Sequence, residues 1–234
     1  MLGSRHVLRA SVAILVVVAA AGAAGWLASA RDRTTLYQPP TPVTRVELVL
    51  ASGSAEISGS RATTVRVERI DRYAFGHPAV ERRSLAGGVL RLSSACPRIL
   101  VGACSASYRL SVPDGVSVSV RTGAGRVRLD GFRGTAQIQT GSGAISVDAF
   151  CGFVLSATSG SGDIRAVSAC APRTLDLRTT GGNATALVPP GRYRVDARSV
   201  SGQVHVRGVV PSDQVPLSIS VQSRSGDVTV GGGL

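Results

Sequence analysis

The chain has 234 residues, a formal net charge of +12 and an aromatic content of only 4%. This length accommodates one large or two small domains. All 26 basic residues are arginine, since lysine is absent. Too few aromatic side chains are present for base stacking, which argues against nucleic acid as a partner.

The amino-terminal residues predict a membrane segment. Residues 10–30 are an uncharged apolar run preceded by Arg5 and Arg9, and this length can cross a bilayer as one helix. Ala28-Ser29-Ala30 also has the A-x-A pattern that signal peptidases cut. Residues 1–30 are therefore expected to be a transmembrane signal anchor or a cleaved signal peptide. The first places a single-pass protein in the cell membrane with its C-terminal domain outside the cytoplasm, and the second secretes it after Ala30.

Residues 31–44 contain three prolines and no periodic apolar pattern, so we expect an extended linker there. A β domain is expected over residues 45–234. Its first part, residues 46–59, resembles one imperfect repeat unit with Ala55 at the turn and Ser52 three residues before it. Residues 61–112 are expected to be a β-meander insertion that covers an open sheet edge.

The rest of the domain is built on a six-fold repeat with a period near twenty residues, which predicts a repeat architecture. A turn glycine anchors each unit: Gly125, Gly143, Gly162, Gly182, Gly202 and Gly226. Apolar residues alternate with polar ones on both sides of each glycine, as in strands with one buried face. The positions expected inside include Val127, Leu129, Ile145, Val147, Ile164, Val204 and Val206. A hydroxyl residue always lies three positions before the glycine.

These patterns predict an all-β fold, a single β-solenoid of six to seven coils stacked in sequence order. Equivalent residues of adjacent coils should lie about 4.8 Å apart. The glycines would supply backbone angles or close approaches that a side chain obstructs.

The four cysteines predict two disulfides, because an even number beyond the membrane segment is typical of oxidised proteins. Cys151 and Cys170 each lie eight residues after a turn glycine in consecutive repeats. They should therefore stack within disulfide range, which leaves Cys96 and Cys104 for each other.

The sequence predicts no catalytic residue, cofactor or metal. The three histidines are scattered and no C-x-x-C pattern occurs. Asp176 and Asp196 would stack at about 5 Å in consecutive coils, a separation that retaining glycosidases use. Arg178 and Arg198 follow on the same face, so an exposed ion network is the simpler interpretation. Asp163 and Asp227, expected three coils apart, could not share one ion.

The chain resembles a bacterial adhesin-type β-solenoid family of unknown function over about residues 43–230. The resemblance lies in the order of the parts: a membrane segment, a V-x-L-x-L coil, a meander ending in Ser111-Val112-Pro113 and repeated T-x-S-G-D-I-x-V coils. Residues 159–164 and 225–230 match it most closely. It implies a surface-located, non-enzymatic domain and assigns no catalytic residue.

The function expected from these observations is a non-catalytic, membrane-tethered surface or scaffold protein. One alternative is an envelope-stress or regulatory accessory that binds a membrane protein, and a weaker one is a carbohydrate-active enzyme. The positive charge favours contact with an anionic cell-surface polymer or headgroup. However, no outward column carries arginine in every coil, which favours a simple solvated coat. An uncovered last coil would permit end-to-end self-association.

Overall fold

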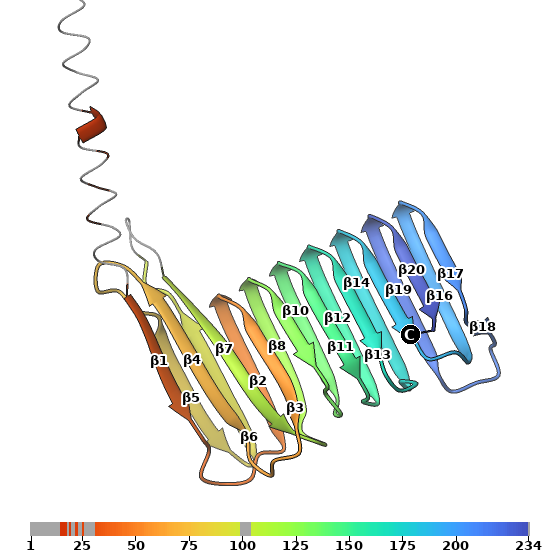
Figure 1. The fold of residues 1–234 in the computed structure, drawn as a ribbon, viewed down its shortest axis with the longest axis horizontal. Coiled ribbons are helices and arrows are strands. Elements are labelled where there is room, and N and C mark those ends of the chain that lie inside the picture. The colour runs from red at the N-terminus through yellow and green to blue at the C-terminus, as the bar shows by residue number, and fades with distance from the viewer. Residues whose placement is uncertain are drawn as a thin grey trace, which may run out of the picture.

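The computed structural model describes residues 15–17, 19, 22, 25, 31–98 and 104–233. The described positions between 15 and 25 are helical, whereas residues 31–98 and 104–233 are all-β, with twenty strands in two ten-stranded sheets around one apolar core (Figure 1). The predicted membrane segment, residues 10–30, lies outside the described residues apart from six positions. In the described part, no helix is long and apolar enough to cross a membrane.

One sheet, called sheet A, has the order β1-β4-β7-β3-β9-β11-β13-β15-β20-β17. Its strands are β1 (Arg31–Tyr37), β3 (Ala55–Ser60), β4 (Arg66–Tyr73), β7 (Cys104–Pro113), β9 (Val127–Asp130), β11 (Ile145–Phe150), β13 (Ile164–Ser168), β15 (Ala184–Val188), β17 (Val204–Arg207) and β20 (Val228–Gly232).

The other sheet, called sheet B, has the order β18-β16-β19-β14-β12-β10-β8-β2-β6-β5. Its strands are β2 (Arg45–Ser52), β5 (Val80–Ala86), β6 (Val89–Ala95), β8 (Ser117–Ala124), β10 (Ala136–Ser142), β12 (Val154–Ser161), β14 (Thr174–Gly181), β16 (Arg192–Ser201), β18 (Val210–Pro211) and β19 (Ser218–Ser225).

The predicted coils are present as strand pairs that contribute one strand to each sheet. In stacking order they are β2/β3, β8/β9, β10/β11, β12/β13, β14/β15, β19/β20 and β16/β17. Equivalent strands are parallel and in register, so that Ile145 lies opposite both Val127 and Ile164. All three side chains are at most 1% exposed. The predicted alternation of buried and outward residues is therefore confirmed for the coils from β2/β3 to β19/β20.

The turns explain both the glycine and the hydroxyl columns. Gly143 has a φ of 145°, and a Cβ there would overlap the carbonyl oxygen of Gly125 in the next coil. Ser159 Oγ donates to the Gly143 carbonyl at 3.1 Å, and Thr179 Oγ1 donates to the Gly162 carbonyl at 3.0 Å. Each hydroxyl thus satisfies a carbonyl at the turn of the neighbouring coil.

The coils do not stack in sequence order, which corrects our prediction. The coil formed by β19 and β20 lies between β14/β15 and β16/β17. Ser223 Oγ accordingly bonds the Gly182 carbonyl, while Ser199 Oγ bonds the Gly226 carbonyl. The repeat pattern is the same in every coil, so periodicity alone cannot reveal such an exchange.

The exchange makes β16/β17 the last coil and exposes residues predicted to lie inside. Val204 is 43% and Val206 is 39% exposed, whereas their partners Val228 and Val230 are completely buried. No described strand pairs with the free edge of β17. The inward direction was predicted correctly, but no coil formed by the described residues covers these two valines.

The predicted register of the β2/β3 coil was wrong by two residues. Ala55 lies opposite Val127, so Gly53 and not Ala55 is the equivalent of Gly125. Leu50, rather than Ser52, occupies the hydroxyl column opposite Thr122. A slip by two residues keeps every side chain on the same face, which is why apolar alternation could not detect it.

The opposite end of the stack is closed by antiparallel strands. Residues 31–37 of the expected linker form β1, which pairs with β4 because its extended backbone completes the edge of sheet A. The predicted insertion is a meander only in part. Its strands β4 and β5 are antiparallel to their neighbours, whereas β6 and β7 stack in parallel on the β2/β3 coil.

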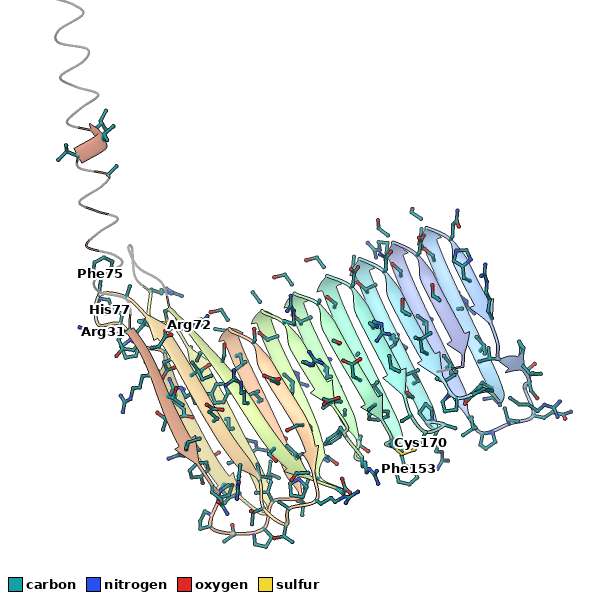
Figure 2. The ribbon with its side chains drawn as sticks, in the orientation of Figure 1. Arg31, Arg72, Phe75, His77, Phe153 and Cys170 are labelled. Atoms are coloured by element: carbon teal, nitrogen blue, oxygen red, sulfur yellow. A yellow bond between two sulfur atoms is a disulfide. The ribbon has the colours of Figure 1, made fainter. Side chains whose placement is uncertain are left out.

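Both predicted disulfides are confirmed. Cys96 bonds Cys104 and Cys151 bonds Cys170, with Cα atoms 5.8 and 4.7 Å apart. The second links the return loops of adjacent coils, where Figure 2 shows Cys170 near Phe153. Its Cα separation is close to the coil spacing, as the repeat geometry predicted.

Candidate binding faces

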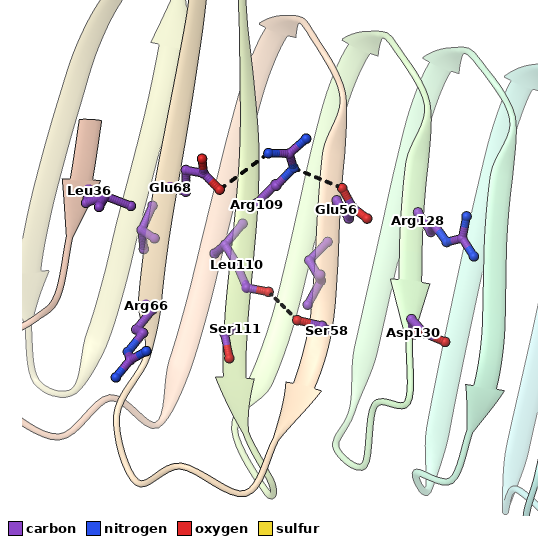
Figure 3. Close-up of a pocket in the computed structure, with 12 residues that line it drawn as sticks. Leu36, Glu56, Ser58, Arg66, Glu68, Arg109, Leu110, Ser111, Arg128 and Asp130 are labelled. Carbon is purple, nitrogen blue, oxygen red and sulfur yellow. Dashed lines mark hydrogen bonds and ion pairs between the residues drawn. The ribbon is translucent and has the colours of Figure 1, made fainter. Parts of the chain in front are cut away.

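The outer face of sheet A carries nearly balanced charge. Arg109 lies 3.5 Å from Glu68 and 3.2 Å from Glu56, and the three form one ion-pair row across β4, β7 and β3 (Figure 3). Further along, Asp148 lies within 3.7 Å of Arg128 and 3.3 Å of Arg165. A groove of about 720 Å³ follows the first part of this row.

On the outer face of sheet A, the charges of the arginines and of the carboxylates nearly cancel. Six arginines face five carboxylates, which leaves a net charge of +1. The residues are Arg66, Arg72, Arg109, Arg128, Arg165 and Arg207, against Asp32, Glu56, Glu68, Asp130 and Asp148.

The outer face of sheet B is strongly basic. Nine arginines face three carboxylates, which leaves a net charge of +6. The residues are Arg45, Arg82, Arg91, Arg121, Arg178, Arg192, Arg194, Arg198 and Arg224, against Glu47, Asp176 and Asp196. We call this surface the arginine face. The excess charge of the two sheet faces is therefore concentrated on one of them.

In-register pairing arranges the arginine face into straight rows. One row, here called the donor row, crosses six consecutive strands: Arg121, Gln139, Thr158, Arg178, Gln222 and Arg198. A second row two residues earlier, the acceptor row, contains Ser119, Gln137, Ser156, Asp176, Ser220 and Asp196. The two rows are about 7 Å apart, since strand residues rise by about 3.4 Å.

Neighbouring side chains orient the donor row without removing it from solvent. Arg121 Nε donates to Gln139 Oε1 at 3.0 Å. Arg178 lies 3.0 Å from Asp176 and Arg198 lies 2.7 Å from Asp196, yet the two arginine side chains are still 57% and 75% exposed. At the other end of the face, a hydrogen bond from Arg91 lowers the pKa of the Glu47 carboxyl.

The acid pair considered for glycoside cleavage is not a pair. Asp176 and Asp196 both lie opposite Ser220 of β19, one on each side, so they do not stack in adjacent coils as predicted. Each carboxylate instead contacts the arginine two residues further along its own strand. The prediction failed because it assumed sequential stacking, whereas the ion-pair interpretation agrees with the structure.

The turn aspartates bind backbone amides. Asp163 and Asp227 lie two coils apart rather than three, with Asn183 between them. Asp163 Oδ1 accepts from the Asn183 amide at 2.7 Å, and Asn183 Oδ1 accepts from the Asp227 amide at 2.8 Å. Asp227 Oδ1 continues the ladder to the Gln203 amide at 2.8 Å. These acids therefore hold successive turns together.

The histidines lie apart from one another. His77 follows β4 in a loop at the closed end (Figure 2), and His205 points outward from β17 at the open end. Within the described residues, no group of three histidine, cysteine or acidic side chains could hold a metal ion.

The sequence did not reveal the arginine face. No single column carries an arginine in every coil, and the asymmetry appears only when the two arms of the repeat are compared. That comparison, made on the sequence, would have shown that arginine without a matching acid is concentrated on the strand before each turn.

Two facing sheets of stacked coils, with a basic outer face on one of them, define a non-globular β-repeat protein with an extended surface. The chain belongs to the family described as Toastrack DUF4097, whose model matches residues 43–231. A search of curated proteins finds no match.

Comparison with solved structures shows this fold in a distantly similar protein. A putative cell adhesion protein from Clostridium sporogenes is 12% identical with a TM-score of 0.51, over 87% of this chain and 100% of the other. A putative adhesin from Bacteroides fragilis is 12% identical with a TM-score of 0.37, over 87% and 97%. At this identity the first likeness concerns the fold alone.

Proposed function

We propose that this protein is a non-catalytic, adhesin-like surface protein that holds anionic polymer or headgroup surfaces through its arginine face. The observation that carries this proposal is the charge difference between the two sheets, +6 against +1 on strands of similar number. A basic face of this extent attracts anionic partners and raises the rate at which they associate.

Location outside the cytoplasm is part of the proposal. All four cysteines are paired in disulfides, as is typical of oxidising compartments. The apolar run at residues 10–30 would tether the chain to the membrane or direct its export. The name of the Clostridium structure, a putative cell adhesion protein, is consistent with a surface role.

The test compares two charge-neutralised variants of the full chain in detergent. One replaces six arginines of the arginine face with glutamine: Arg45, Arg91, Arg121, Arg178, Arg198 and Arg224. The matched control replaces the six outward arginines of sheet A and removes the same charge. Binding to polygalacturonate beads and to vesicles containing phosphatidylglycerol would be measured at several salt concentrations.

We expect the first variant to lose most binding and most of its salt dependence, while the control retains both. Equal loss in both variants, or binding by neither the variants nor the native chain, would overturn the proposal. Thermal unfolding of each variant checks that the fold persists.

A further inference from the structure

The arginine face also has a direction, and this direction restricts what it can bind. The donor row runs along the stack axis, across six strands at about 4.8 Å each. It therefore presents cationic, amide and hydroxyl groups on one straight line about 24 Å long. We infer that the donor row binds a single linear, hydroxyl-bearing polyanion, such as an acidic glycan, that lies along the stack axis. This inference rests on the proposed function.

The two rows differ in what they offer an anion. Every member of the donor row can donate a hydrogen bond, and its three arginines lie at the first, fourth and sixth positions. The acceptor row beside it contains two carboxylates, Asp176 and Asp196. The other four members of that row, serines and a glutamine, are uncharged. An anionic ligand is therefore favoured by the arginines of the donor row and repelled by the two carboxylates of the acceptor row.

This alternation favours a narrow chain over a lipid surface. A layer of headgroups would cover both rows at once and meet the two carboxylates. A polymer one chain wide can follow the donor row and remain about 7 Å from the acceptor row. Arg178 and Arg198 are oriented by those carboxylates while more than half of each side chain is exposed to solvent.

The surface next to the donor row leaves room for such a chain. A shallow groove of about 410 Å³ lies at its first three members, bordered by Arg121, Gln139 and Thr158. Its other wall is exposed backbone at Gly123 and Gly141. The groove stands beside the donor row and leaves the acceptor row out of its lining.

The residues in the two rows also indicate how the polymer is recognised. Neither row, as the structure describes it, contains an aromatic side chain on which a sugar ring could stack. Recognition would instead use the anionic groups, which the arginines can contact in bidentate fashion, and the hydroxyls, which Gln139, Thr158 and Gln222 can bond. A polyanion with hydroxyls between its charges fits this order.

The experiment compares two triple variants that remove the same charge from the same face. The first, R121Q/R178Q/R198Q, interrupts the donor row. The second, R45Q/R192Q/R224Q, leaves it intact. Full-length chain in detergent would be titrated with polygalacturonate, with size-fractionated oligogalacturonates, with neutral dextran and with vesicles of phosphatidylglycerol and phosphatidylcholine.

We expect the first triple to weaken polygalacturonate binding about tenfold and the second no more than about threefold, since only the first removes aligned charge-assisted donors. Affinity should rise with oligomer length until the oligomer spans about 24 Å and then level off. Dextran should not bind, and vesicles should bind more weakly, with the same small loss in both triples.

Other outcomes separate this inference from the proposed function. If both triples weaken binding equally, the arginine face binds anions diffusely and the donor row has no special role. If vesicles bind more tightly than polygalacturonate, the ligand is a lipid surface and the polymer assignment is wrong. If neither triple changes binding, both the inference and the proposed function fall.

Discussion

The two ends of the stack are built differently. At the closed end, β1 and β5 complete the sheets and Arg69, Asp71, Glu81 and Tyr108 form a polar cluster between them. At the open end, β17 has a free edge and apolar Val204 and Val206 are partly exposed. Repeats with similar sequences thus have different environments, because burial depends on the position of a coil in the stack.

The largest expected loss of stability is at Arg69, in the polar cluster of the closed end. This side chain contacts Asp71 at 2.6 Å and Glu81 at 3.1 Å, and Asp71 is only 4% exposed. R69L would leave a buried carboxylate without its partner, so we expect the free energy of unfolding to fall by about 3–5 kcal/mol. Urea unfolding measures this change.

The matched control is R109L on the outer face of sheet A, where Arg109 is 56% exposed and also contacts two glutamates. Its loss should be at most about 1 kcal/mol, because solvent screens exposed pairs. Similar losses in the two variants would show that the cluster at the closed end is not a buried charge site.

The next largest effect concerns the disulfide between coils. Replacing Cys151 and Cys170 with alanine should lower stability by about 3 kcal/mol, because the unfolded chain is no longer constrained. The measurement is the urea midpoint of the double variant. Reduction of the native chain breaks both disulfides, so its loss of stability should be at least as large. An unchanged midpoint in the double variant would show that this cross-link does not constrain the unfolded state.

A pair of equivalent valines tests the comparison most directly. Val230 is buried and Val206, its partner in the last coil, is 39% exposed. V230A should cost about 2 kcal/mol, since it removes buried methyl groups and leaves a void. V206A should cost less than about 1 kcal/mol. Equal costs would indicate that the open end is covered in solution, as end-to-end self-association would require.

The smallest expected effect is at the hydroxyl column. Ser223 Oγ donates to Gly182 at 2.9 Å in an inner coil, and Ser199 Oγ donates to Gly226 at 2.7 Å in the last coil. S223A should cost about 1 kcal/mol, because Ser223 is only 5% exposed and the Gly182 carbonyl would lose this hydrogen bond at a site with little access to water. S199A should cost only a few tenths, since water can reach the half-buried site. A reversed order would argue against the stacking described here.

Much of the fold could be predicted because the same strand–turn–strand pattern occurs in every repeat. The alternation around Gly143 and Gly162 fixed which side chains are inside, and the coil spacing gave the Cys151–Cys170 disulfide. The order of the last two coils could not be predicted, since Val195 and Ile219 satisfy the same template. The strand β1 was missed because its pairing is at an edge, where no apolar alternation is needed.

Of the candidate site, only the excess of positive charge could be predicted from the sequence. The sequence showed an excess of arginine, but the rows depend on which strands are neighbours and on which sheet each arm enters. Asp176 and Asp196 illustrate the limit: the correct outward face was predicted, whereas their separation depended on the exchanged coil.

The exchanged coil order has a consequence for how the chain reaches this structure. During synthesis, residues 192–207 emerge before residues 218–232, and the edge they meet is that of β14 and β15. Their apolar columns fit that edge, so a non-native stack can form first and must open before β19 and β20 enter. On this route the terminal coil reaches its place by displacement, and we expect a slow folding phase confined to the last third of the chain.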